Sequence, residues 1–121
     1  MTNKPLFTFI SCFTLLLTIG CSKDQTPGDI TPLTCEEPVS FQSDVMTLIM
    51  SSCATSGCHN EASASSGYSF TSYQNIETNK EIMLKTMRKE PGVTPMPIGQ
   101  ELDPASINLF ECWIEQGAKN N

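Results

Sequence analysis

The pattern of apolar and polar positions predicts helices along most of this chain. In its first half, apolar residues recur at helical spacing: Phe41, Val45, Met46 and Ile49. This spacing predicts a helix over residues 43–52. Ser40 or Ser43 can cap its N-terminus, and Asp44 favours that end because the helix dipole is positive there.

The middle of the chain predicts one or two further short helices. Its apolar positions are Ile76, Ile82, Met83, Leu84 and Met87. Residues 91–99 contain three prolines and two glycines, so the helical stretch must end before them. Residues 60–67 are small and polar, which predicts a loop, and residues 68–70 could form a short extended piece.

The last helix has the clearest boundaries. Asp103 is a good N-cap, Pro104 suits the first helical position, and Gly117 is a natural stop. Its apolar face consists of Ile107, Phe110, Trp113 and Ile114. The whole pattern predicts an all-α fold of three to four short helices joined by long loops.

Residues 1–20 have the features of an export signal. Lys4 precedes an apolar stretch, and small Gly20 precedes Cys21. The stretch ending at Cys21 resembles a bacterial lipoprotein signal, although Thr18 stands where that family usually has Leu. The resemblance implies cleavage before Cys21 and lipidation of its thiol, whereas an ordinary signal peptide would leave Cys21 incidental.

The predicted export signal is the first of three parts of the chain. Residues 21–34 have the composition of a flexible tether, and residues 35–121 remain as one small domain. The mature protein is expected outside the cytoplasmic membrane, held by its lipid and facing the periplasm or the cell surface. The formal net charge of −6 argues against nucleic-acid binding, which requires a basic face.

The strongest chemical signal is the segment CATSGCH at residues 53–59. Two thiols followed at once by an imidazole are what covalent haem attachment requires, because the thiols add to the porphyrin vinyl groups and the imidazole binds iron. The usual motif has two residues between its cysteines, and this one has four. A zinc site or a disulfide between Cys53 and Cys58 are the alternatives.

A low-spin haem also needs a ligand on its far face. His59 is the only histidine, so a second imidazole from this chain is excluded. Met96 lies between Pro95 and Pro97, which stiffen the backbone on both sides of it. It could instead be a loop residue that packs on the core. The other methionines after the signal, at predicted helical positions, are expected in the core: Met46, Met50, Met83 and Met87.

The helix before residues 53–59, the Pro-Met-Pro loop and the closing helix together resemble class I c-type cytochromes. More narrowly, residues 41–120 resemble lipoprotein cytochromes of Bacteroidetes-type bacteria. The resemblance implies a cytochrome c-like fold around one covalent haem c, with His59 and Met96 as axial iron ligands. The wide cysteine spacing and the additional Cys35 and Cys112 depart from the family pattern.

The remaining cysteines are assigned by counting. Cys12 leaves with the signal, Cys21 takes the lipid, and the pair in residues 53–59 takes the haem. A disulfide between Cys35 and Cys112 is therefore predicted, with free thiols or an intermolecular bond as the alternative.

These features predict a single-electron carrier that serves redox partner proteins, and no enzyme activity. No nucleophile is paired with a base in the sequence. Two other functions stay open. One is a disulfide-stapled binding lipoprotein without a cofactor, and the other is an open-site haem enzyme or sensor in which Met96 does not bind iron.

Overall fold

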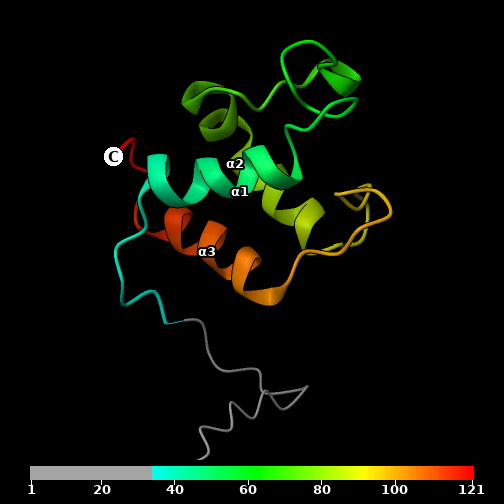
Figure 1. Cartoon of the computed structure of the whole chain (residues 1–121). Coiled ribbons are helices and arrows are strands. Elements are labelled where there is room, and N and C mark those ends of the chain that lie inside the picture. Colours follow the sequence, from blue (N-terminus) through cyan, green and yellow to red (C-terminus); the bar gives the residue numbers. More distant parts are fainter. Residues whose placement is uncertain (1–33) are drawn as a thin grey trace, which may run out of the picture. The chain divides into compact units, whose positions relative to one another are not determined.

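The computed structural model describes residues 34–121, and the part of the chain so described is helical (Figure 1). Its elements are η1 (Phe41–Val45), α1 (Met46–Ser52), η2 (Ser65–Gly67), α2 (Tyr73–Met87) and α3 (Pro104–Glu115). No strand occurs within these residues, so the predicted all-α class is confirmed. The expected signal, tether and lipidation site at Cys21 lie outside the described residues.

The first helix begins at Phe41, two residues before the predicted start, and its first turn is a π-turn that runs directly into α1. Ser40 is the cap, because its side-chain oxygen accepts a hydrogen bond from the Ser43 amide at 3.3 Å. Asp44 completes a reciprocal pair by accepting from the Ser40 amide at 2.8 Å. Two otherwise unpaired amides are thereby satisfied at this end.

The middle of the chain forms one helix, α2, whose start is capped by the Ser72 hydroxyl. Its buried face consists of Ile76, Met83, Leu84 and Met87, whereas Ile82 is exposed. The helix ends at Met87 with Arg88 as its C-cap, and Lys89 then takes a left-handed conformation with φ +56°. The chain next enters the Pro-rich segment, which is free of helix as predicted.

The α3 helix has the predicted boundaries. An Asp103 carboxylate oxygen accepts from the Ser106 amide at 3.0 Å, and Pro104 occupies the first position. The helix ends before Gly117, whose φ of +94° suits a residue without a side chain. Phe110, Cys112 and Trp113 are its buried residues.

The core is centred on Trp113, which has no exposed surface. Its ring centroid lies 5.6 Å from that of Phe41 and 5.5 Å from that of Phe110, while Phe41 meets Tyr73 edge-on at 5.0 Å. The indole N–H donates to the Lys119 carbonyl at 2.9 Å. One aromatic cluster therefore joins η1, α2 and α3.

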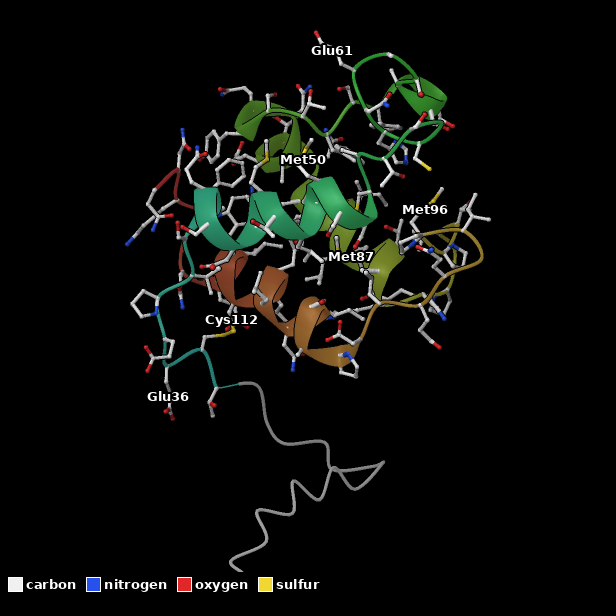
Figure 2. All side chains as sticks on the ribbon, in the orientation of Figure 1. Glu36, Met50, Glu61, Met87, Met96 and Cys112 are labelled. Atoms are coloured by element: carbon white, nitrogen blue, oxygen red, sulfur yellow. A yellow bond between two sulfur atoms is a disulfide. The ribbon has the colours of Figure 1, made fainter. Side chains whose placement is uncertain are left out.

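The segment before the first helix is fastened to α3. Cys35 and Cys112 form a disulfide with a Cα–Cα distance of 5.2 Å, the pairing that the cysteine count predicts (Figure 2). The Gln116 side chain adds three hydrogen bonds, accepting from the Val39 amide at 2.8 Å and donating to the carbonyls of Glu37 at 2.9 Å and Cys35 at 3.4 Å. This strap holds residues 35–39 along the end of α3.

Replacing both Cys35 and Cys112 by Ala should lower the free energy of unfolding by about 4 kcal/mol, because the bridge closes a loop of 77 residues in the unfolded chain. Urea unfolding with and without a reductant measures this difference. The double variant is the control, since a reductant should leave its unfolding midpoint unchanged. Equal midpoints for the oxidised and reduced natural chain would contradict the prediction.

Candidate functional site

The first thiol of the CATSGCH segment is placed by the end of α1. The Cys53 amide donates to the Ile49 carbonyl at 2.8 Å, and the next amide, of Ala54, donates to the same carbonyl. Ala54 is buried, and Cys53 is partly buried against the core. The helix end therefore fixes both the position and the surroundings of the Cys53 thiol.

The second thiol lies at the surface. The Cys58 amide donates to the Thr55 carbonyl at 3.0 Å, which closes a turn, and the Cys58 carbonyl accepts from the Ser65 amide at 3.0 Å. Cys58 is exposed, and neither it nor Cys53 is in a disulfide. The alternative of a disulfide between these two cysteines is absent from the structure.

His59 is oriented through one of its ring nitrogens. Its Nδ1 lies 3.1 Å from the Tyr68 carbonyl oxygen, which can only accept, so Nδ1 carries the proton when this bond forms. The ring packs against Phe70 with a centroid distance of 4.8 Å. The remaining nitrogen, Nε2, then has a free lone pair, which is the state required of a metal-binding imidazole.

Burial raises the pKa of the Cys53 thiol to about 11, and the nearby Cys58 adds to the rise. The thiol therefore stays protonated at neutral pH in the chain without a cofactor. A protonated thiol is a poor nucleophile, since nucleophilic attack belongs to the thiolate. Cys53 is thus protected from rapid disulfide formation by its position at the end of α1.

Met96 lies on a different loop, between α2 and α3. Its amide donates to the Thr86 carbonyl at 3.1 Å, which ties the middle of the loop back to the last turn of α2. The side chain is half-buried. Among the described residues no hydrogen bond joins this loop to the loop that follows α1.

The other methionines divide between the core and the surface. Met83 and Met87 are buried and Met46 packs against the core, as expected. Met50 is 46% exposed, so the expectation of a core position for it is wrong.

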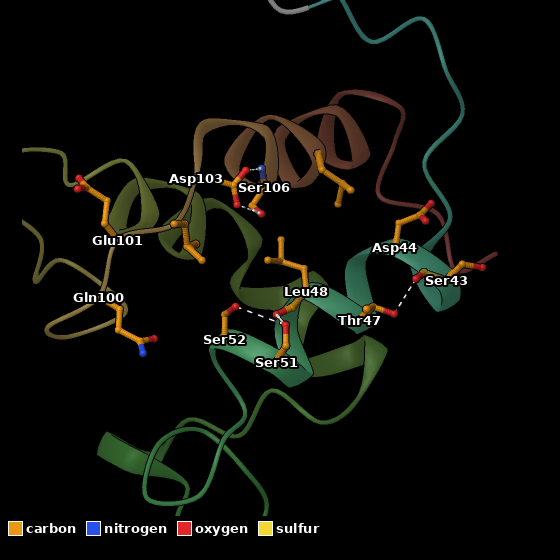
Figure 3. Close-up of a pocket in the computed structure, with 12 residues that line it drawn as sticks. Ser43, Asp44, Thr47, Leu48, Ser51, Ser52, Gln100, Glu101, Asp103 and Ser106 are labelled. Atoms are coloured by element: carbon orange, nitrogen blue, oxygen red, sulfur yellow. Dashed lines mark hydrogen bonds between the residues drawn. The ribbon is translucent and has the colours of Figure 1, made fainter. Parts of the chain in front are cut away.

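A groove on the described surface is a different feature from these loops. Its volume is about 810 Å³, and it lies between α1, the start of α3 and the segment before α3 (Figure 3). Leu48, Leu102 and Leu109 contribute apolar surface, but most of the lining carries hydroxyl, amide or carboxylate groups. The groove reaches Ser52 and includes none of the predicted haem-binding residues.

The zinc alternative lacks ligands in this geometry. Within residues 34–121, no group of three or more His, Cys, Asp or Glu side chains is arranged to hold a metal ion. Cys35 and Cys112, which would have to complete a site with Cys53, Cys58 and His59, are bonded to each other. The donors present are two free thiols and one oriented imidazole, a set whose chemistry fits covalent haem attachment.

Sequence reasoning missed the partners that organise this loop. The Tyr68 carbonyl is a backbone group, so the identity of residue 68 does not indicate its hydrogen bond to His59. Ser63 accepts from the Gly57 amide at 2.9 Å, and Asn60 accepts from the Ser63 amide at 2.7 Å. Small polar residues near a motif are too common in loops to be singled out without a structure.

Comparisons of the chain with protein-family models, with curated proteins and with solved structures found no match. Among residues 34–121, no helix is both long and apolar enough to span a membrane. The assignment of a function therefore depends on the residues of this chain alone.

Cys53 in the haem-free chain should react slowly with iodoacetamide below pH 10, with a rate that rises roughly tenfold per pH unit as the thiolate forms. Exposed Cys58 should be labelled first. Mass spectrometry of peptides taken at timed intervals gives both rates, and the chain unfolded in urea, where the two thiols should react alike, is the control. A Cys53 rate that levels off near pH 9 would contradict the predicted pKa.

Proposed function

We propose that this protein is a single-electron carrier, a small class I c-type cytochrome with one haem c. The observation that carries the proposal is the arrangement of residues 53–59. Two unpaired thiols flank a turn, and the adjacent His59 has one ring nitrogen occupied by the Tyr68 carbonyl and the other free. Haem iron, when bound, would supply the ferric and ferrous states between which an electron is stored.

Different residues of the chain would have different roles in binding the haem. Cys53 and Cys58 would bond to the porphyrin edge, and His59 Nε2 would bind iron on the proximal face. The Tyr68 carbonyl would hold the imidazole in one tautomer and strengthen it as a donor, as partners of the unbound nitrogen do in other metal sites. Phe70, packed on the imidazole, would keep water from that side of the ring.

Met96 is proposed as the ligand on the opposite face. A thioether is soft and neutral, so it favours ferrous iron and raises the reduction potential relative to a second imidazole. The bond from the Met96 amide to the Thr86 carbonyl restricts the loop before any ligand binds. Pro95 and Pro97 restrict it further, which lowers the entropy cost of holding the sulfur in place.

An electron carrier needs no substrate pocket, and the exposed position of Cys58 suits the exchange of electrons at the surface. A haem bonded there would be accessible to a docked protein. The proposed partners are redox proteins that dock briefly at this edge. A lipid on Cys21 would keep the carrier at the membrane, where such partners are concentrated.

Haem should stay on the polypeptide after denaturation and extraction with acidic acetone. The test uses the full chain produced together with cytochrome c maturation machinery, and intact mass should exceed that of the mature polypeptide by one haem. Replacing Cys53 and Cys58 together by Ala should abolish retention, while the matched replacement of Cys35 and Cys112 should leave it intact. Haem that passes into the solvent would refute covalent attachment.

Met96→Ala should abolish the weak near-infrared sulfur-to-iron band of the ferric protein and open a site for carbon monoxide in the ferrous protein. The reduction potential should fall by on the order of 100 mV, a small part of the range that axial ligands control. Met50→Ala, which removes an exposed methionine of α1, is the control and should leave band and potential unchanged. A natural protein without the band would favour the open-site enzyme or sensor.

A further inference from the structure

The loop that contains both thiols keeps a compact frame in spite of its two additional residues. The His59 amide donates to the Cys53 carbonyl at 3.1 Å, so the first and last residues of the seven-residue segment are joined directly. Residues 54–58 must therefore form a loop between the two ends of this hydrogen bond. The frame therefore sets where the chain leaves Cys53 and where it arrives at His59, independently of how many residues lie between.

The additional length is taken up by a turn over residues 55–58. The Thr55 carbonyl accepts from the Cys58 amide at 3.0 Å, which leaves Ser56 and Gly57 at the two central positions. Gly57 has φ +81°, a left-handed backbone conformation that glycine adopts without steric cost. Both central residues are exposed, so the insertion lies at the surface.

The turn is fastened from outside by a short chain of side-chain hydrogen bonds. The Ser63 hydroxyl oxygen accepts from the Gly57 amide at 2.9 Å. The Ser63 amide in turn donates to the Asn60 side-chain oxygen at 2.7 Å. Ser56, which also has a hydroxyl in this turn, makes no hydrogen bond among the described contacts. Ser63 is thus the residue whose side chain connects Gly57 to the rest of the loop.

We propose that Ser63 is a positioning residue for covalent haem attachment, which holds the inserted turn so that the Cys58 thiol is presented at the correct place. This inference depends on the proposed function. Each thiol adds across one vinyl double bond: sulfur bonds to the carbon next to the ring, and the thiol hydrogen goes to the terminal carbon. No electron or by-product leaves. Both additions succeed only if the Cys53 and Cys58 thiols are held at a fixed distance from each other.

The test compares Ser63→Ala with Ser56→Ala in the full chain produced with maturation machinery. The pyridine haemochrome spectrum distinguishes haem with one unreacted vinyl group from haem bonded at both. Ser63→Ala should increase the singly bonded fraction roughly threefold to tenfold, the change in turn population that one ordinary hydrogen bond controls. Ser56→Ala should match the natural chain. Ser63→Thr, which keeps the hydroxyl, should restore double attachment and shows that loss of folding is not the cause.

Deletion of Ser56 and Gly57 provides a second arm, because it leaves the segment CATCH with the usual spacing. This variant should attach haem through both cysteines, and Ser63→Ala should have no further effect in it, since the Gly57 amide is gone. An equal effect of Ser63→Ala in both backgrounds would show a general structural role and overturn the inference.

The two proposals fail in distinguishable ways. A natural chain that attaches no haem refutes the electron carrier, and the positioning role with it. Haem that is doubly attached in Ser63→Ala to the same extent as in the natural chain refutes the positioning role alone. Amide hydrogen exchange in the haem-free chain gives a check without the cofactor, since exchange at Gly57 should accelerate roughly threefold to tenfold in Ser63→Ala. An unchanged exchange rate would also overturn the role of Ser63.

Discussion

Burial of the Trp113 indole is the interaction on which the described structure depends. The ring is fully enclosed, and its neighbours Phe41, Tyr73 and Phe110 come from all three major helical segments. A buried indole N–H without a partner would be costly, and the Lys119 carbonyl removes that cost. Because this one side chain packs η1, α2 and α3 together, it places the two helices whose ends carry the candidate site: α1, which continues from η1, and α2.

The candidate site is built on these two helix ends. The Ile49 carbonyl at the end of α1 holds the chain at Cys53, and the Thr86 carbonyl at the end of α2 holds the loop at Met96. Ion pairs support the second loop, since Lys89 contacts Glu101 at 2.6 Å across its base. Arg88 also pairs with Glu111 of α3. Reactive groups on loops that a rigid scaffold positions are a common arrangement in proteins.

Local chemistry was sufficient to predict most of the helix boundaries. Asp103, Pro104 and Gly117 act within one or two turns of themselves, and the structure has all three in the expected roles. The start of the first helix was predicted two residues late because its additional support comes from the other end of the chain. Asn121 accepts hydrogen bonds from the Phe41 amide at 2.9 Å and the Gln42 amide at 3.0 Å.

The difference between local and long-range interactions also decides which features of the candidate site could be predicted. The proximity of Cys53, Cys58 and His59 follows from sequence spacing, and so could be predicted. The use of the Tyr68 carbonyl and the Ser63 hydroxyl depends on how residues 60–70 fold back, which spacing does not show. The separation of the Met96 loop from His59 depends on the packing of α2 against α3, which is a long-range property.

The distribution of stability along the chain gives a physical reason for covalent attachment at residues 53–59. Between Ala54 and Phe70 no side chain is buried, and the hydrogen bonds of this stretch are made within it or to the residues that flank it, Cys53, Phe70 and Thr71. Such a segment opens more easily than a helical core. The disulfide cannot compensate, since Cys112 lies away from Glu61 and Met96 in Figure 2. A cofactor bonded at both cysteines would supply the missing constraint where the small core does not reach.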